Sequence, residues 1–222
     1  MNGLRLAGGV CLSLLLPCVA QAGGVAVVGR TSTLGFGAEL TTGLSDKVNF
    51  RVGGNLFSYN RSFTQDDNDQ FDLSFDFRSV DGILDFHPTG GGFRLSGGVI
   101  GNGNKAGLVA RAAGASYEIG NNRYGVADVG ALTGAANVGN VAGYAGIGFG
   151  NPVGRGKRVG LVIDLGVAFQ GAPEVRLAAT GPIAGNAAFQ RDLTLEEQDF
   201  NADARRFRYY PVLSVGISVK LN

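Results

Sequence analysis

Apolar and polar residues alternate along much of this chain, and the segment Tyr209–Leu221 shows the pattern most clearly. Its odd-numbered positions are Tyr, Pro, Leu, Val, Ile, Val and Leu, whereas its even-numbered positions are Tyr, Val, Ser, Gly, Ser and Lys. Successive side chains of a β-strand point to opposite faces, so this period of two predicts a strand with one continuously apolar face. The segment is also longer than the usual strand of about 5–6 residues.

Other segments repeat this alternation, and they predict strands throughout the chain. They lie around residues 34–41, 48–56, 71–86, 93–99 and 159–169. Within 71–86 the apolar positions change from odd numbers, ending at Phe77, to even numbers, starting at Val80. A β-bulge inserts one extra residue and produces such a shift, so we expect a bulge between Arg78 and Val80.

Strands of this kind suit two architectures, which differ in what the apolar face contacts. A soluble sandwich or lipocalin-like barrel turns that face inward, whereas a membrane barrel turns it toward lipid. Strands of about 10–13 residues, a second face rich in Gly and Ser that carries both signs of charge, and links that alternate between short and long all favour the membrane barrel. Because only a closed barrel pairs every backbone group in lipid, we expect the strands to close.

The lengths of the links determine the topology of this barrel. The short links are 44–47, 87–92 and 151–157, and the long links are 61–70, 103–137 and 170–208. Outer-membrane barrels have short periplasmic turns, long outer loops and an even number of strands. We therefore expect an all-β, antiparallel up-and-down barrel of eight strands, at roughly 24–30, 33–43, 48–60, 71–86, 93–102, 138–150, 158–169 and 208–221. A ten-stranded barrel, with a further hairpin from 103–137, is the alternative.

The two faces of these strands divide the candidate functional residues into two groups. The interior of an eight-stranded barrel is just wide enough for side chains to fill it, and ions buried there need partners. We expect a salt-bridged network in the barrel interior, made of Glu39, Arg51, Asp72, Asp76, Arg78, Asp81, Asp85, Arg94, Asp164 and Lys220. We expect the opposite face to contact lipid through Phe50, Phe75, Phe77, Leu161, Ile163, Leu165, Val215, Ile217, Val219 and Leu221.

The two longest links carry patterns of their own. Link 103–137 contains two short alternating runs, Gly107–Ala113 and Ala115–Gly120, which predict a small hairpin above the membrane. In 186–207, four apolar residues recur near helical spacing among charged ones: Phe189, Leu193, Phe200 and Phe207. This spacing predicts an amphipathic helix that either packs on its own loop or the barrel rim, or forms a lid or a surface for a ligand or partner.

Composition and charge argue against two further interpretations, a helical bundle and a nucleic-acid-binding protein. Gly contributes 38 of the 222 residues, and because each Gly inside a helix costs roughly 1 kcal/mol relative to Ala, the composition argues against a helical bundle. The formal net charge is +1, which gives no electrostatic reason to expect nucleic acid as a partner.

The first 22 residues have the pattern of a secretory signal peptide. Arg5 precedes an apolar run from Leu6 to Ala20, and Ala20-Gln21-Ala22 supplies the small residues at which such signals are cleaved. The run is too short and too often interrupted by glycine to cross a bilayer as a helix. We expect residues 1–22 to be removed, which leaves 200 of the 222 residues, 23–222, as a single outer-membrane β-barrel domain.

Little catalytic or metal-binding chemistry remains after this cleavage. Both cysteines, Cys11 and Cys18, lie in the signal, so the mature chain has no disulfide and no thiolate site. The one histidine, His87, lies in a short turn without a nucleophile, and we expect it at the membrane interface rather than in an active site. The run Asp66–Asp69 lacks the Gly and the distal Glu of an EF-hand and supports weak surface cation binding at most. We therefore expect no catalysis, no cofactor and no metal.

Several runs of residues carry a resemblance to a known family. They span nearly the whole mature chain: 33–39 (TLGFGAE), 44–51 (LSDKVNFR), 84–88 (LDFHP), 92–98 (GFRLSGG), 169–171 (FQG) and 209–212 (YYPV). With these runs the chain resembles the uncharacterised small outer-membrane β-barrel proteins of Gram-negative proteobacteria. The resemblance implies an outer-membrane location and no established activity. Such barrels commonly end in Phe, which the assembly machinery reads, whereas this chain ends in Leu221 and Asn222. That departure bears on the efficiency of assembly rather than on the architecture.

Four functions fit these observations to different degrees. The one we favour is an integral outer-membrane barrel, structural or surface-exposed, whose loops make the interactions. The second function is a narrow channel or transporter for small solutes. The third is an outer-membrane enzyme, which the single histidine disfavours. The fourth is a soluble periplasmic barrel that binds an apolar ligand. For the favoured function the partners are the lipid bilayer and, through the C-terminal strand, the outer-membrane assembly machinery. We expect a monomer that binds no nucleic acid.

Overall fold

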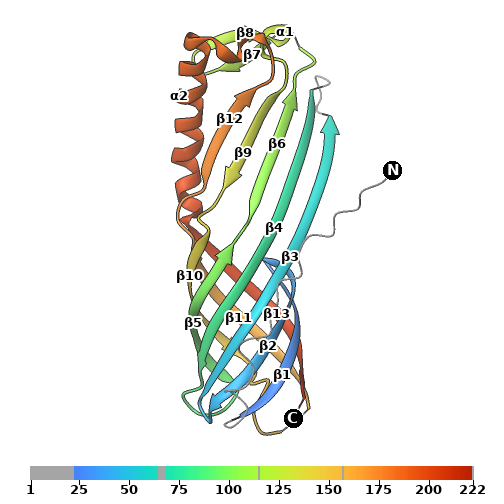
Figure 1. The fold of residues 1–222 in the computed structure, drawn as a ribbon, viewed down its shortest axis with the longest axis vertical. Coiled ribbons are helices and arrows are strands. Elements are labelled where there is room, and N and C mark those ends of the chain that lie inside the picture. The colour runs from blue at the N-terminus through green and yellow to red at the C-terminus, as the bar shows by residue number, and fades with distance from the viewer. Residues whose placement is uncertain (1–22, 65–68, 115, 157, 222) are drawn as a thin grey trace, which may run out of the picture.

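The chain folds into a closed antiparallel barrel, and part of its sheet continues beyond the barrel (Figure 1). The computed structural model describes residues 23–64, 69–114, 116–156 and 158–221, so the expected signal, 1–22, lies outside the described residues. The barrel strands are β1 (Gly23–Ser32), β2 (Gly35–Ser45), β3 (Val48–Thr64), β4 (Gln70–Phe86), β5 (Phe93–Asn102), β10 (Val141–Phe149), β11 (Val159–Phe169) and β13 (Tyr209–Lys220). Each corresponds to one predicted strand, so the eight-stranded barrel is confirmed over the ten-stranded alternative.

The hydrogen-bonded ladder runs all the way around the barrel. The order of the strands is β4-β3-β2-β1-β13-β11-β10-β5, and β5 pairs with β4 again. The first and last strands meet over seven paired positions, from Ala26 opposite Lys220 to Ser32 opposite Ser214. Each barrel strand therefore has a neighbour on both sides, which is the condition for placing backbone in lipid.

Strand β4 is longer than the barrel wall and changes its neighbour halfway along. Its segment Ser79–Phe86 pairs with β5, whereas Gln70–Asp76 pairs with β6. Strand β6 pairs in turn with β9, and β9 pairs with β12. The wall of the barrel thus continues as an open sheet on one side only.

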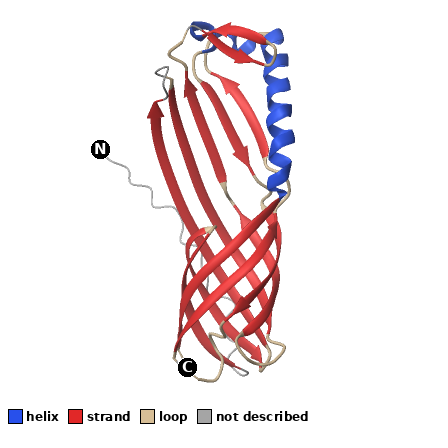
Figure 2. Ribbon diagram, turned by 180° about the vertical axis from the view of Figure 1, so that it is seen from behind, coloured by secondary structure: helices blue, strands red, loops and turns tan. Residues whose placement is uncertain are grey.

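We call this open sheet the extension. It consists of the upper halves of β3 and β4 (Phe57–Thr64 and Gln70–Phe77), β6 (Lys105–Arg111), β9 (Leu132–Asn137) and β12 (Glu174–Ala179). Figures 1 and 2 show the extension standing above one side of the barrel, with the helix α2 (Ala187–Ala204) lying along its β12 side.

A small cap closes the far end of the extension. It contains the hairpin of β7 (Ser116–Ile119) and β8 (Asn122–Gly125), followed by the short helix α1 (Val126–Val129). The hairpin predicted from 107–113 and 115–120 was therefore wrong in its pairing. Strand β6 pairs with β4 and β9 instead. Strand β4 extends beyond the end of β5, so its backbone groups there need another partner, and the next segment of the chain supplies it.

The expected bulge between Arg78 and Val80 is absent. Strand β4 pairs with β3 without a register shift, from Gln70 opposite Thr64 to Phe86 opposite Val48. The apolar positions change from odd to even because the surroundings of the strand change where it leaves the barrel. In the barrel the even positions face the exterior, and in the extension the odd positions form an apolar face that continues from the lumen.

The amphipathic helix predicted in 186–207 is confirmed as α2. Its N-cap is Asn186, whose side-chain oxygen accepts hydrogen bonds from the backbone N–H of Ala188 at 2.8 Å and Phe189 at 3.2 Å. Phe189 and Leu193 are buried against the cap.

Two short 3-10 helices flank α2: η1 (Pro182–Gly185) and η2 (Arg205–Arg208). The last two predicted apolar positions, Phe200 and Phe207, are exposed, because only the N-terminal half of α2 meets the cap. None of the described helices combines the length and the apolar character that a membrane crossing needs.

Candidate functional site: the filled lumen and the extension

Arg51 is the centre of an ionic network inside the barrel. Its guanidinium group lies 3.2 Å from Oε2 of Glu39, 2.7 Å from Oδ2 of Asp85 and 3.3 Å from Oδ1 of Asp164. These carboxylates come from β2, β4 and β11, so one cation on β3 connects three other strands of the barrel. All four side chains are at most 5% exposed.

Arg94 extends this network toward β5. Its Nη2 lies 2.8 Å from Oδ1 of Asp164, and its Nη1 donates to the carbonyl oxygen of Gly150. The hydroxyl of Ser96 donates to Asp85 at 2.6 Å. Buried carboxylates therefore receive several charge-assisted hydrogen bonds each, which is what keeps an ionised group tolerable away from water.

Arg30 on β1 is the member of the network that the sequence analysis missed. It lies 2.5 Å from Oε2 of Glu39, forms an ion pair with Asp81 and donates to Oδ1 of Asn55 at 3.1 Å. The sequence did indicate an inward position for Arg30, because Ala26, Val28 and Arg30 are alternate residues and share one face of β1. Both faces of that strand are small and mostly apolar, so the alternation alone did not identify the inward face.

The predicted interior residues separate into three groups. Six are buried in the lumen: Glu39, Arg51, Asp81, Asp85, Arg94 and Asp164. Lys220 lies apart from them at the end of the barrel that carries the short turns, which we call the turn end. There its Nζ donates to the carbonyl oxygens of Val153 at 3.1 Å and Gly154 at 3.3 Å.

The other three residues, Asp72, Asp76 and Arg78, were wrongly placed inside. They lie on the outward face of the extension, where Asp76 pairs with Arg78 at 3.0 Å and Asp72 with Arg111 at 2.6 Å. Their side chains are 42–70% exposed. From Arg78 back to Gln70, strand β4 has left the barrel. The face that contacts lipid in the barrel segment of β4 therefore contacts water in the extension.

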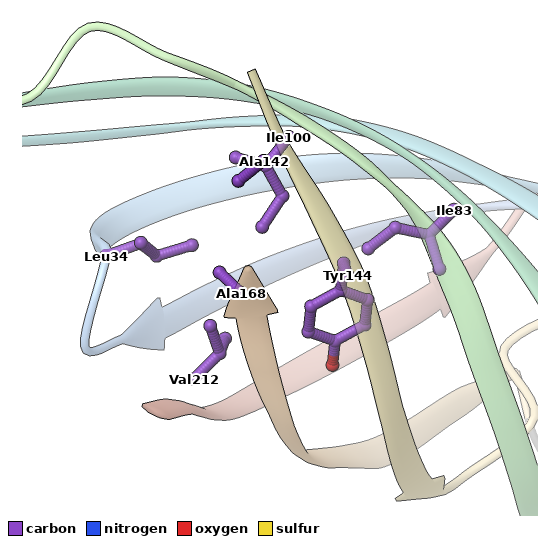
Figure 3. Packing of buried hydrophobic residues seen from close by; sticks show 7 residues of the cluster. All are labelled: Leu34, Ile83, Ile100, Ala142, Tyr144, Ala168 and Val212. Atoms are coloured by element: carbon purple, nitrogen blue, oxygen red, sulfur yellow. The ribbon is translucent and has the colours of Figure 1, made fainter. Parts of the chain in front are cut away.

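An apolar cluster fills the end of the lumen opposite the turn end. Figure 3 shows its side chains pointing toward one another from several strands: Leu34, Ile83, Ile100, Ala142, Tyr144, Ala168 and Val212. Between this cluster, which we call the apolar plug, and the ionic network a cavity of about 20 Å³ is left. Such a volume holds about one water molecule. The described side chains therefore fill the lumen.

Two glycines, Gly146 on the same strand and Gly166 on the neighbouring strand β11, make room for the ring of Tyr144. A Cβ atom added to Gly166 would lie 2.6 Å from both the ring and the hydroxyl of Tyr144, and one added to Gly146 would lie 2.6 Å from that hydroxyl. The largest side chain of the plug thus lies across two positions where no side chain fits.

His87 lies buried at the turn end, so its expected place at the membrane interface was wrong. Its Nδ1 lies 2.9 Å from the carbonyl oxygen of Gly91, which can only accept, and its Nε2 lies 3.1 Å from the amide nitrogen of Asn49. The pattern describes a neutral ring that donates through Nδ1 and accepts through Nε2. Both ring nitrogens of His87 therefore have hydrogen-bonding partners at the turn end.

The exterior of the barrel is a continuous apolar belt. Leu161 is 57% exposed and Ile217 is 60% exposed. The other predicted lipid contacts on the barrel wall are exposed as well: Phe50, Ile163, Leu165, Val215, Val219 and Leu221. Soluble proteins rarely expose a contiguous apolar surface of this size, whereas membrane barrels require one. The barrel is thus an integral membrane barrel.

Phe75 and Phe77 were predicted to contact lipid, and this was wrong. They lie in the extension, on the face that continues from the lumen, opposite Tyr59 and Phe57 of β3. The ring centroids of Phe57 and Phe77 are 5.9 Å apart, and those of Tyr59 and Phe75 are 6.5 Å apart. Farther from the barrel, Phe63 and Phe71 stack at 5.3 Å. These rings form an aromatic face above the barrel mouth.

Between this face and α2 lies an apolar groove of about 160 Å³. Leu73, Leu108, Val175 and Leu177 line its floor, and Phe200 of α2 lines its side. The helix thus covers the β12 side of the apolar face and leaves the aromatic β3–β4 side open.

Polar contacts join the cap to α2. The carboxylate of Asp192 accepts from the hydroxyl of Tyr124 and, at 2.7 Å, from the amide of Asn122. These two hydrogen bonds lower the pKa of Asp192, and the bond to Asp192 raises the pKa of Tyr124. Glu196 accepts from the backbone N–H of Gly120 at 3.1 Å.

The described ranges contain no cluster of three or more side chains suited to hold a metal ion. Most of the run Asp66–Asp69 lies outside the described residues. Asp69 is described, and its carboxylate accepts from the backbone N–H of Ala113 at 2.7 Å.

Comparison with solved structures identifies similar barrels. CarO2 of Acinetobacter baumannii aligns over 90% of this chain and 100% of its own, with 21% identity and a TM-score of 0.60. CarO of the same organism aligns over 89% of this chain and 98% of its own, with 20% identity and a TM-score of 0.58. No model of a known protein family matches the chain, and no curated protein matches it in sequence. The similarity to the two structures supports the fold described above.

Proposed function

We propose that this protein is an outer-membrane barrel of a Gram-negative bacterium whose filled lumen anchors the extension at the cell surface. The apolar belt and the closed ladder of eight strands support insertion in a membrane. The outer membrane is where single-chain barrels of this kind occur. Cleavage of residues 1–22 and recognition of β13 by the assembly machinery belong to this proposal.

The orientation follows from the lengths of the connections. Outer-membrane barrels place short turns in the periplasm and long loops outside. The extension, the cap and α2 all belong to the long connections, so they lie outside the cell in this orientation.

The filling of the lumen is the observation that carries the proposal. Arg51 and its partners join three walls, and the apolar plug occupies the lumen on the other side of them. A solute pathway would need this packing to be absent, so a scaffold fits the interior better than a channel. The hydrogen bonds that engage both nitrogens of His87 argue against a catalytic role for the one histidine. We expect the barrel to act as a monomer, because its ladder is complete within one chain.

Cell fractionation combined with gel mobility tests the membrane assignment. We expect the protein in the outer-membrane fraction, with a mobility that changes on heating because a folded barrel resists detergent. Recovery in the soluble periplasm would overturn the proposal and favour the soluble ligand-binding barrel. Purified protein in planar bilayers should give no steady conductance, and ohmic steps would favour the channel.

Labelling of single cysteines in intact cells tests the orientation. Cys11 and Cys18 leave with the signal, so an introduced cysteine is the sole thiol of the mature chain. Ser58→Cys in the extension should react with a membrane-impermeant maleimide, whereas Asp46→Cys at the turn end should react only after the membrane is permeabilised. The opposite result would place the extension in the periplasm.

A further inference from the structure

The two edges of the extension are treated differently by the chain. At the β12 edge, α2 supplies hydrogen-bonding partners to the outer backbone groups. Asn201 accepts from the N–H of Val175 at 2.8 Å and donates to its carbonyl oxygen at 2.9 Å, and Glu197 accepts from the N–H of Leu177 at 2.6 Å. These two side chains take the place of a neighbouring strand and prevent another chain from pairing there.

At the other edge, no strand of the described residues pairs with the part of β3 that lies above the barrel. Strand β2 pairs with β3 up to Leu56, opposite Phe36, and no described strand pairs with Phe57–Thr64 on that side. All eight residues of this segment are exposed. We call Phe57–Thr64 the open edge; Figure 1 shows it at the border of the extension, on the side away from α2.

The backbone groups that the open edge presents can be assigned from β4. Arg78 donates its N–H to the side chain of Asn104 and accepts from Gly103, so its backbone groups point away from β3. Directly opposite residues of an antiparallel pair either exchange both bonds or neither. Leu56 lies opposite Arg78, so it and every second residue after it point their N–H and C=O away from β4. On the open edge these residues are Ser58, Asn60, Ser62 and Thr64.

The sequence of the open edge has few of the features that normally protect such an edge. Proteins protect exposed strands with Pro, charged side chains such as Lys, inward-pointing charges, bulges or a covering helix. Phe57–Thr64 contains neither Pro nor Lys, and its pairing with β4 has no register shift. Its inner face carries Phe57, Tyr59 and Phe63, and one charge, Arg61, which makes no ion pair with any described residue.

We propose that the open edge binds an extended peptide segment of another protein, which adds to the extension as a further strand. Backbone hydrogen bonds to Ser58, Asn60 and Ser62 would supply affinity, and the side chains on the inner face would supply specificity. The partner segment carries apolar or aromatic residues at alternate positions and a carboxylate opposite Arg61. This inference rests on the proposed function for its setting outside the cell.

A second copy of this chain fits the open edge less well. Two barrels in one membrane point in the same direction, so their open edges meet as parallel strands related by a twofold axis. Such an arrangement brings the two Arg61 side chains toward each other, and like charges facing across strands are unfavourable. A partner with an acidic residue removes this conflict.

A synthetic peptide tests the proposal on the intact protein in lipid nanodiscs. The probe has the sequence of residues 70–78, which already pairs with β3 on its other side, with Leu73→Glu to place a carboxylate opposite Arg61. Fluorescence anisotropy of the labelled peptide measures the affinity. We expect saturable binding, about tenfold weaker to Asn60→Pro, which removes an N–H from the open edge only. Asn60→Ala keeps that N–H and should bind as the unmodified protein does.

Two further measurements keep the test independent of how the Pro variant folds. A peptide N-methylated at alternate residues cannot donate to the open edge and should lose binding to the unmodified protein. A peptide with Leu73→Lys should bind more weakly than the Glu form, and Arg61→Glu in the protein should reverse that order.

Equal binding to all variants, or no binding of the Glu peptide, would overturn the proposal. Self-association that depends on Asn60, without peptide binding, would overturn it in favour of a second copy. Because the assay uses purified protein in nanodiscs, its failure leaves the membrane assignment standing, and fractionation or labelling tests that assignment separately.

Discussion

Arg51 and Asp164 form an ion pair across the full width of the lumen, with Nη2 3.3 Å from Oδ1. Their strands, β3 and β11, lie on opposite walls, because three strands separate them in either direction around the barrel. Asp164 also binds Arg94 at 2.8 Å. The pair therefore connects walls that share no backbone hydrogen bond, and it fixes the lumen in a filled state.

Removing Arg51 should destabilise the barrel strongly. Arg51→Met leaves Glu39, Asp85 and Asp164 with fewer cationic partners, and breaking a buried pair by removing one partner costs about 3–5 kcal/mol. Urea unfolding in detergent, followed by the loss of the heat-modifiable gel band, measures the change. Arg78→Ala is the matched control: its pair with Asp76 is exposed, and exposed pairs contribute about 0–1 kcal/mol. Equal effects of the two variants would contradict the assignment of Arg78 to the extension.

Adding a methyl group at Gly166 should displace the ring of Tyr144. The new Cβ would lie 2.6 Å from that ring, and forcing extra atoms into a packed interior costs about 1–3 kcal/mol. Gly166→Ala should therefore lower the urea midpoint, whereas Gly82→Ala, where a Cβ meets nothing within 4 Å, should leave it unchanged or slightly raised. If the Gly166 variant unfolds like the unmodified protein, Tyr144 does not pack as described.

Removing the side chain of Asn201 should release the β12 edge. Asn201→Ala loses both hydrogen bonds to Val175, and unsatisfied backbone groups cost about 1–3 kcal/mol. Amide hydrogen exchange of Glu174–Ala179 should accelerate, while exchange in β11 stays the same. Gln198→Ala, on the exposed side of α2, serves as the control. Unchanged protection of β12 would show that α2 does not hold this edge.

The contact between Tyr124 and Asp192 should respond to acid in a defined direction. The folded-state pKa of Asp192 lies below its ordinary value of 3.8 because Tyr124 and Asn122 donate to the carboxylate. The contact therefore contributes stability above pH 3.8, and this contribution is lost as the pH falls through the lowered pKa. Tyr124→Phe should raise the pKa of Asp192, measured by NMR titration of the carboxyl carbon, and should speed exchange in β7 and β8. An unchanged pKa would mean that the cap does not rest on this hydrogen bond.

The alternation of residues predicted the strands well because lipid and lumen make opposite demands on neighbouring positions. Ile163 and Ile217 face the exterior, whereas the next residue of each strand, Asp164 and Ser218, points into the lumen. This alternation can be read from the sequence without knowing how the strands pack. The helix α2 was predicted for a similar reason, since the spacing of Phe189 and Leu193 reports its buried side.

The same alternation failed where the surroundings of a strand change along its length. Asp72 and Asp76 follow the polar pattern of an inward face, yet they lie outside because β4 has left the barrel at that height. Phe75 and Phe77 follow the pattern of a lipid-facing side, yet they pack against Tyr59 and Phe57 in the extension, because β4 has left the barrel there. A period of two separates the faces of a strand but carries no information about what each face contacts.

The order of apolar and polar residues along the chain was sufficient to predict long amphipathic strands, a closed barrel of eight of them, and the apolar side of most strands. Three features became visible only in the folded chain. Arg30 and Arg51 share Glu39, and β6 pairs with β4 instead of forming a hairpin with the next run. One edge of the extension is covered, and the other is open. This division arises because the faces of a strand follow from the local order of residues, whereas ion-pair partners and sheet edges depend on the stagger between strands that are distant in sequence.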